Sequence, residues 1–332
     1  MIHRVFPLSV ALIIIAGCST PRRADLRSKL KPGCEVHYLV TSRTERTQRV
    51  ESAPGEPPRE IQSVYAHDVG MRLRCREVRE DGSAVLDWSL PYVAISMKGR
   101  MPVEYDSRDP EQADSPLGLM FAQLINQPAT VTVDASGQVT DYVDPASIGG
   151  GPIRYFMASL LSRQAYRLWG LLAMGGAPSD AGVDATWSDV QPVDLPQGLG
   201  TMLVASHYRL EGLTERGTIA EIVADGTLSM REPEPTDDET PAEQPRLVIN
   251  VGEFARKTVW DCSAGQLISS ESRSKLIGTA PGRAGTMAIE EATTTSVKRA
   301  TPQELRRAAE KPASPEPEDE PQPHAEAQPD DE

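Results

Sequence analysis

Apolar and polar residues alternate along most of the chain, and this pattern predicts half-buried β-strands. In the stretch 69–76 (VGMRLRCR), apolar side chains take one face and three arginines take the other. Similar runs occupy about 35–50, 84–97, 101–105, 129–133, 138–143, 201–210, 217–230, 246–260, 266–277 and 284–298. Together they predict a meander of about eleven antiparallel strands.

Short turns rich in Asp and Gly separate several of these runs. The stretches 80–83 (EDGS), 134–138 (DASGQ) and 261–266 (DCSAGQ) share an aspartate followed by a glycine. Such turns join antiparallel neighbours, so the strands on either side of each one are expected to pair as hairpins.

Two amphipathic helices are predicted to interrupt the strands. The first begins at Ser115-Pro116, a helix N-cap followed by proline, and ends before Gln127-Pro128. The second begins at Pro152 and carries a broad apolar face as far as residue 172, with arginines elsewhere. Both apolar faces need a partner, and a sheet would provide one.

A long antiparallel sheet must close or cover its apolar face, because exposed edges and open apolar faces promote aggregation. The predicted fold is therefore mainly β (α+β): a strongly curved antiparallel half-barrel whose concave face is covered by the two helices. The domain is expected to span residues 33–300.

The N-terminal run 5–16 is apolar, but it is too short to cross a bilayer and contains Pro7. Its length and position are typical of a signal peptide. The next residues, Ile15-Ala16-Gly17-Cys18, resemble the lipobox of bacterial lipoproteins. That resemblance implies cleavage between Gly17 and Cys18 and acylation of Cys18, hence a signal peptide over 1–17 and a lipidated tether over 18–32.

The lipobox resemblance also sets the expected location. Ser19 follows the cysteine where aspartate in some bacteria signals inner-membrane retention, so an outer-membrane anchor facing the periplasm is expected. Several acyl chains make a stable anchor. The alternative is a chance Gly-Cys pair behind an uncleaved N-terminal helix.

Charge and composition restrict the partners. The formal net charge of −14 argues against nucleic acid. Residues 312–332 hold eight acids, six prolines and no lysine or arginine, so we expect an acidic, disordered tail over 301–332. A similar acidic, proline-rich stretch at 231–245 is expected to be a solvated loop within the domain.

Several short motifs in the body of the chain resemble a domain family of unknown function found in bacterial envelope lipoproteins. They are 103–107 (VEYDS), Leu119-Met120, 129–139, Trp187, 196–198, 208–212 (YRLEG) and 260–267. The resemblance covers about residues 33–298 and implies no known activity. The order of strands and helices is also similar to that of half-barrel lipoprotein carriers, which hold acyl chains between a curved sheet and its helices.

No catalytic, cofactor or metal motif stands out. Three histidines, His37, His67 and His207, lie in separate predicted strands, and a local turn explains the carboxylate pair Asp106 and Asp109. The glycines at 149–151 are a turn or an anion cradle, and the Gly198-Leu-Gly200 stretch lacks the features of a dinucleotide site.

Three cysteines remain after Cys18. Cys34, Cys75 and Cys262 allow one disulfide with three possible pairings in an oxidising compartment, or buried free thiols. The sequence contains no C-x-x-C motif, so neither a zinc ribbon nor a thioredoxin-like centre is indicated.

These observations favour a non-catalytic module that binds or carries an apolar or lipid ligand in the half-barrel. The alternative is a structural or interaction lipoprotein with a filled core and an envelope protein as its partner. A hydrolase would require His67, His207 or a carboxylate pair to meet in one cleft.

Overall fold

The computed structural model describes residues 23–50, 58–99, 102–122, 125–135, 139–143, 177–194, 200–214, 217–231, 247–282 and 285–310. Twelve strands form one sheet: β2 (Glu35–Val50), β3 (Arg59–Val78), β4 (Ala84–Lys98), β5 (Val103–Asp106), β6 (Ala129–Val133), β7 (Val139–Val143), β9 (Thr186–Asp194), β10 (Thr201–Leu213), β11 (Ile219–Met230), β12 (Val248–Asp261), β13 (Gln266–Gly282) and β14 (Gly285–Ala300). The short strands β1 (Arg23–Ala24) and β8 (Ala181–Gly182) pair separately.

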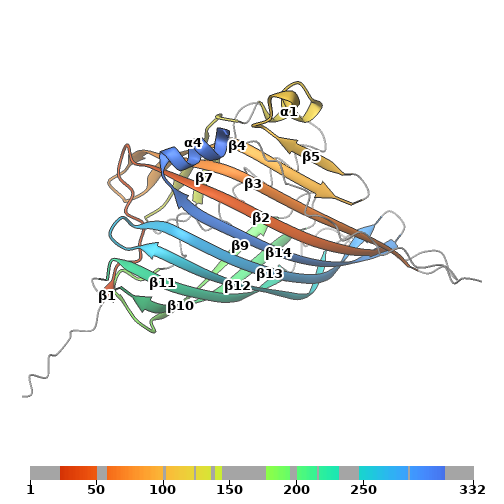
Figure 1. Cartoon of the computed structure of the whole chain (residues 1–332). Coiled ribbons are helices and arrows are strands. Elements are labelled where there is room, and N and C mark those ends of the chain that lie inside the picture. Colours follow the sequence, from red (N-terminus) through yellow and green to blue (C-terminus); the bar gives the residue numbers. More distant parts are fainter. Residues whose placement is uncertain are drawn as a thin grey trace, which may run out of the picture.

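The large sheet is antiparallel and open. Its strand order is β7-β6-β4-β3-β2-β14-β13-β12-β11-β10-β9, with β5 beside the second half of β4. The first long strand, β2, pairs with the last, β14, so the two ends of the meander meet in the middle of the sheet. Figure 1 shows the sheet curling so that β9 lies behind the central strands. This confirms the predicted curved antiparallel half-barrel.

One face of the curved sheet carries the core, and we call it the inner face. Side chains of β2, β3 and β4 (Val40, Val69, Val93) join one apolar cluster with Leu210 of β10 and Ile222 of β11. The strand register places all of these on the same face. Strands from both halves of the sheet therefore enclose a common core, and the opposite, outer face carries most of the charge.

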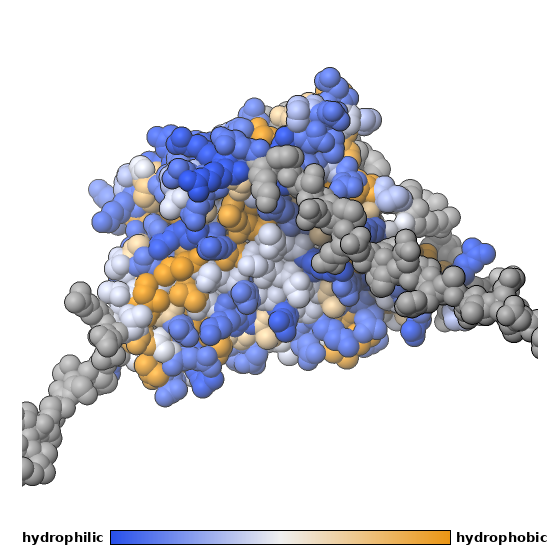
Figure 2. Space-filling model, viewed as in Figure 1, coloured by the Kyte–Doolittle hydropathy of each residue, from blue (hydrophilic) through white to orange (hydrophobic). Residues whose placement is uncertain are grey.

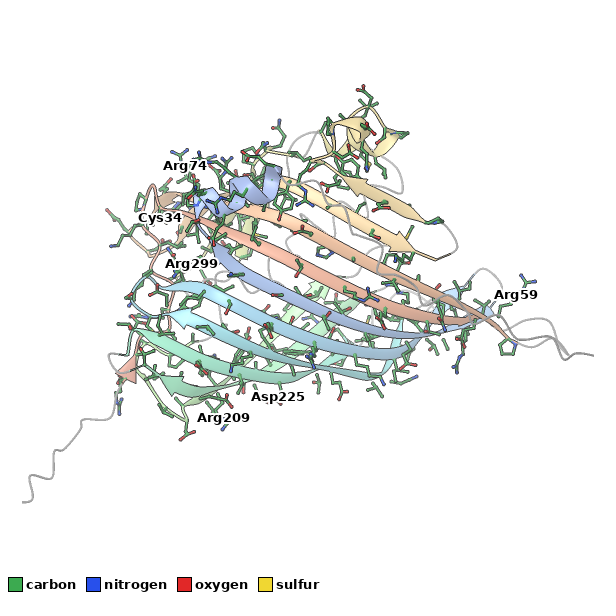
Figure 3. All side chains as sticks on the ribbon, in the orientation of Figure 1. Cys34, Arg59, Arg74, Arg209, Asp225 and Arg299 are labelled. Carbon is green, nitrogen blue, oxygen red and sulfur yellow. The ribbon has the colours of Figure 1, made fainter. Side chains whose placement is uncertain are left out.

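The two ends of the half-barrel differ. At one end, the segment 23–34 lies across the strands: Leu26 is only 1% exposed, and its N–H donates to the Pro178 carbonyl. We call this the capped end. Cys34 and Arg299 lie there in Figure 3, whereas Arg59 lies at the opposite, far end. The expected tether over 18–32 is thus part of the packed domain from residue 23 onward.

Two predicted turns are built on their aspartate and glycine. The Asp81 carboxylate accepts from the Ser83 N–H at 2.8 Å, and Gly82 has φ +81°. Asp261 accepts from the N–H groups of the two residues after Cys262, and Gly265 closes that turn at φ +61°. Glycine tolerates this left-handed backbone without steric cost.

The helices differ from the prediction. The first is short, α1 (Pro116–Phe121), with Ser115 as its N-cap accepting from the Gly118 N–H; it places Phe121 on the core. The tail was predicted to be disordered from residue 301, and this boundary is wrong because α4 (Pro302–Glu310) forms there. This helix packs on the outer face, against β2, β3 and β14, so it does not cover the concave side.

The physical reason for α4 lies in its first turn. Thr301 and Glu304 form a capping box: the Glu304 N–H donates to the Thr301 hydroxyl, and the Thr301 N–H donates to the Glu304 carboxylate. The buried Leu305 then fixes the helix on the sheet. The signal T-P-Q-E was present in the sequence but was hidden by the polar composition around it.

Some strands also differ. Strand β9 was not predicted, and β3 begins ten residues before the predicted 69–76 run, at Arg59. The inward positions of this earlier part include Ser63 and His67, so the apolar alternation is lost there. Several predicted segments lie outside the described residues: residues 1–22 with Cys18, the glycines at 149–151, the second predicted helix (152–172), residues 232–245 of the acidic loop and the tail beyond 310.

Candidate functional site

The inner face changes character along the strands. At the capped end it is apolar and fully buried, with Trp88, Trp260 and Tyr38 each at 0–1% exposure. Next to this core lies a row of hydroxyl side chains, which we call the hydroxyl belt: Ser42, Thr44, Ser206, Thr258, Ser270, Ser272, Thr293 and Thr295.

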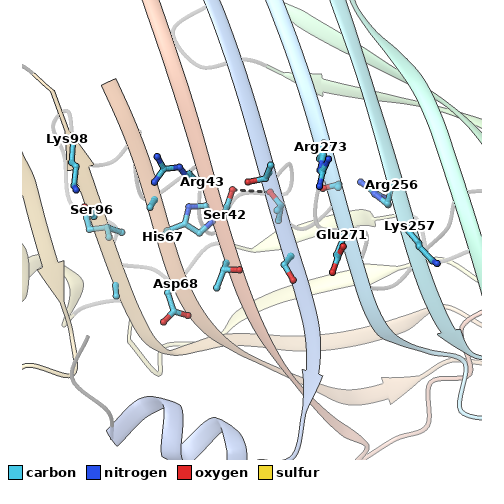
Figure 4. A pocket seen from close by; sticks show the side chains of 18 of the residues that line it. Ser42, Arg43, His67, Asp68, Ser96, Lys98, Arg256, Lys257, Glu271 and Arg273 are labelled. Carbon is cyan, nitrogen blue, oxygen red and sulfur yellow. Dashed lines mark hydrogen bonds between the residues drawn. The ribbon is translucent and has the colours of Figure 1, made fainter. Parts of the chain in front are cut away.

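Cross-strand pairs hold the belt together. Ser42 and Thr295 are hydrogen-bonded at 3.0 Å, and Thr44 and Thr293 at 2.9 Å. Figure 4 shows the Ser42 bond as a dashed line. Arg256 faces inward beside the belt, with its guanidinium carbon 6.0 Å from the centroid of the Phe254 ring. The inner face therefore offers donors and acceptors next to an apolar floor.

Beyond the belt, toward the far end, the inward positions become apolar again. We call this group the rim set: Ile61, Tyr65, Met97, Leu228, Phe254, Leu276 and Ile289. Unlike the capped-end core, every member is partly exposed. Arg46 lies over the Tyr65 ring at 5.3 Å and pairs with Glu291 at 2.6 Å, so charged groups are held next to these apolar side chains.

A groove with a volume of about 1320 Å³ crosses the outer face. Its floor consists largely of small outward residues, among them Ala66, Ala94 and Ala255. Figure 2 shows this side of the molecule as largely hydrophilic. The groove was not anticipated from the sequence. The carrier hypothesis instead expects a ligand cavity between the sheet and the second predicted helix, which lies outside the described residues.

Both signs of charge line the groove, and Figure 4 shows several of these side chains on the central strands. The basic residues are Arg43, Lys98, Arg108, Lys257, Arg273 and Arg256, whose side chain reaches the lining from an inward position. The acidic ones are Asp68, Glu104, Asp106, Asp109, Glu211, Asp225 and Glu271. Alternation along a strand places such charges on its solvent-facing side, so the charges within strands, apart from Arg256, were visible as outward positions. Arg108 and Asp109 lie instead in the turn after β5. Their assembly into one groove depends on pairing across nine strands, β2–β5 and β10–β14.

The three histidines lie apart. His37 contacts Glu35 on the outer face near the capped end, with Nε2 2.8 Å from the carboxylate oxygen. His207 pairs with the Ser188 hydroxyl at 2.8 Å on the outer face of β10. His67 lies on the inner face opposite Ser42, where desolvation lowers its pKa to about 4, partly offset by Asp68.

The carboxylates of the 106–109 turn have structural roles. Asp106 accepts two hydrogen bonds from the Arg108 guanidinium and one from the Arg108 N–H, and Asp109 caps the short helix η1 (Pro110–Gln112) through the Glu111 N–H. The Ser107 hydroxyl accepts from the Val93 N–H at 3.0 Å. This is the local capping that the sequence predicted.

The described cysteines are free thiols. Cys34 and Cys75 face one another where β2 and β3 begin to pair, whereas Cys262 lies in the turn after β12. Gly200 has φ +101° beside β10, and Gly198 lies outside the described residues.

Within the described residues, every helix is too short or too polar to cross a membrane. No family model matches the chain, and no curated protein matches it either.

Several solved structures are similar to the chain in shape. One is lipovitellin, solved to describe lipid–protein interactions: 10% identity, a TM-score of 0.45, and coverage of 82% of this chain and 26% of that one. The chain thus spans about a quarter of the lipovitellin chain's length. Another is the outer membrane protein OprG of Pseudomonas aeruginosa, with 6% identity, a TM-score of 0.23, and coverage of 83% of this chain and 99% of that one. A third is OccK7 (OpdD) of the same organism, with 9% identity, a TM-score of 0.23, and coverage of 82% of this chain and 99% of that one.

Proposed function

We propose that the chain is an envelope lipoprotein, anchored through Cys18, that binds an apolar or amphiphilic ligand at the far end of its inner face. The observation that carries this proposal is the contrast in burial along that face. Inward apolar residues are fully buried at the capped end, whereas the rim set stays partly exposed. Exposed apolar side chains inside a curved sheet provide a surface that an apolar ligand would cover.

The neighbouring groups suit an amphiphile. The apolar part of the ligand would lie against Leu276 and Ile289, and a polar group would reach the hydroxyl belt and Arg256. The capped-end core is already filled by large side chains such as Trp88 and Trp260, so the ligand is expected at the far end only.

The anchor and this site would lie at opposite ends. Cys18 precedes Arg23 by five residues, so the lipid group would lie within about 17 Å of the capped end. The far end would then point away from the membrane, where a ligand enters from the periplasm.

Native mass spectrometry of the protein released gently from the envelope tests for a copurified apolar molecule. A matched pair of variants then locates its site with a fluorescent long-chain fatty acid as probe. Ile289→Glu places a charge on the inner face and is expected to weaken probe binding about tenfold or more. Ala288→Glu places the same charge on the outer face and should leave binding unchanged.

Absence of any bound molecule together with absence of probe binding would overturn the proposal. Equal loss of binding in both variants would also contradict it, because an effect independent of the face cannot come from the rim set.

The outer groove supports a second candidate, an interaction lipoprotein whose partner is another envelope protein. The supporting observation is its polar lining of both charges, which suits a protein surface better than a lipid. A photocrosslinking residue at Ala255, in the groove, should yield one stoichiometric protein adduct in intact cells. The same group at Thr227, exposed on the outer face but outside the groove lining, is the control; adducts of equal yield at both positions would contradict this candidate.

A further inference from the structure

Two cysteines distant in sequence lie opposite each other at the capped end. The register of β2 and β3 pairs Glu35 with Arg74, so the preceding Cys34 faces Cys75. The backbone confirms this placement: the Cys75 N–H donates to the Cys34 carbonyl at 2.9 Å, and the Gly33 N–H donates to the Cys75 carbonyl at 2.8 Å. Figure 3 shows Cys34 at this end, close to Arg74.

The two thiols differ in exposure. The Cys75 thiol donates to the Glu77 carbonyl at 3.5 Å and is buried at 1% exposure, whereas Cys34 is partly exposed. Burial, reinforced by Cys34, raises the pKa of Cys75 to about 11. Opposite residues of an antiparallel pair have Cα atoms roughly 4.5–5.5 Å apart, which lies inside the range of about 4.4–6.8 Å found for disulfides.

The third thiol has a different environment. Cys262 lies in the turn between β12 and β13, where its carbonyl accepts from the Lys29 ammonium at 2.7 Å and its sulfur contacts the Trp260 carbonyl at 4.0 Å. Among the three described cysteines, Cys34 and Cys75 are therefore the pair whose residues lie opposite each other on neighbouring strands.

We propose that Cys34 and Cys75 form a disulfide in the mature protein and that Cys262 stays reduced. The partly exposed Cys34 loses its proton and attacks the disulfide of a thiol oxidant in the envelope, which gives a mixed disulfide and releases one thiolate of the oxidant. Cys75 then loses its proton, attacks the Cys34 sulfur and expels the second thiolate. As the Cys34–Cys75 bond forms, the two cysteines lose two electrons, the disulfide of the oxidant is reduced, and its two thiolates take up the two protons.

This bond would fasten the capping segment to the sheet. Segment 23–34 leads from the expected anchor into β2, and its packing closes the capped end through Leu26. A covalent link from Cys34 to β3 would hold this junction even when the segment's other contacts open.

The test uses the full-length chain with Cys18→Ser, so that three thiols remain, oxidised with glutathione disulfide. After alkylation, tryptic mapping should find peptide 30–43 linked to peptide 75–76, with Cys262 alkylated. Addition of dithiothreitol should lower Tm by roughly 5–15 °C. A further Cys262→Ser change should alter neither result.

Cys34→Ser is the informative control, since it removes the bond while replacing a partly exposed side chain. In that variant, the linked peptide should disappear and dithiothreitol should no longer shift Tm. A crosslink that includes Cys262, or quantitative alkylation of Cys34 and Cys75 after oxidation, would overturn the inference.

Discussion

Arg108 and Asp106 form an enclosed ion pair in the outer groove. The Arg108 side chain is 5% exposed and pairs with Asp106, itself 7% exposed, at 2.7 Å. The guanidinium also lies 4.4 Å from the centroid of the Tyr92 ring and donates to the Ala308 carbonyl at 2.9 Å. Desolvation lowers the pKa of Arg108, but the bond to Asp106 and its charge outweigh this, so the net pKa is raised.

Replacement of Arg108 by alanine should be strongly destabilising. The Asp106 carboxylate would remain buried without its counter-ion, which typically costs about 3–5 kcal/mol in the free energy of unfolding. Urea unfolding measures this loss. Arg209→Ala, which breaks the exposed pair with Glu211, should cost about 1 kcal/mol or less, and similar losses in both variants would contradict the role of burial.

His67 should make stability depend on pH. Its pKa of about 4 in the folded protein lies below the ordinary value of 6.5, so the unfolded chain binds more protons between these values. The free energy of unfolding therefore falls as the pH falls through this range, by about 1 kcal/mol between about pH 7.5 and about pH 5.5. His67→Gln should lack this component, as shown by urea unfolding at the two pH values.

His207 provides the control for that measurement, because it lies exposed on the outer face. His207→Gln should lose as much stability on acidification as the unmodified protein. If His67→Gln shows the same loss as well, the pH dependence does not come from His67.

At the scale of elements, α4 is attached to the sheet at a position that only glycine permits. A Cβ on Gly70 would lie 2.5 Å from the Tyr92 ring and 2.7 Å from Leu305 Cδ1. Both neighbours are buried, so neither can move away without disturbing its own packing. The missing side chain in β3 is thus what lets the helix approach the outer face.

Gly70→Ala should release α4 and destabilise the fold by about 1–3 kcal/mol. Limited trypsin digestion should detect faster cleavage at Arg306 and Arg307, and thermal unfolding should show a lower Tm. Gly212→Ala is the matched control, because its nearest neighbour, the Glu221 Cβ, is 3.9 Å away. Unchanged cleavage in Gly70→Ala would argue against this docking geometry.

At the largest scale, the two ends of the half-barrel differ in burial, and the proposed function assigns ligand binding to the less buried end. The capped end holds the large buried side chains and the segment 23–34, whereas the far end leaves inward apolar side chains partly exposed. A mutation at the capped end should therefore lower stability before it changes binding of an apolar probe.

Leu26→Ala tests this division. Loss of a fully buried leucine should cost about 2–5 kcal/mol, and at a temperature where the variant stays folded its probe affinity should match that of the unmodified protein. Leu119→Ala, at a side chain 60% exposed, should change neither quantity. A loss of probe affinity in folded Leu26→Ala would place the ligand at the capped end.

Local patterns along the chain were enough to predict most of the strands and the fold class. The alternation of apolar and polar residues in a strand involves only residues close together in the chain. Nearby residues were therefore enough to predict the solvent-facing and buried faces of β2 and β4, the Asp–Gly turns and the Ser115 cap. The same local logic identified 106–109 as a structural turn. It failed where an inward position is polar, as at His67, and at α4, whose capping box is surrounded by polar residues.

Contacts between distant residues, by contrast, follow from the folded sheet and not from any local pattern. The outer groove, the hydrogen bond from Arg108 to the Ala308 carbonyl of α4 and the placement of Cys34 opposite Cys75 all join segments that are far apart in sequence or on different strands. Strand order and register set these contacts, and β2 pairs with β14 through a closure of some 250 residues that no local pattern encodes. Likewise, burial along the inner face depends on how far the sheet curls, which is a property of the whole sheet.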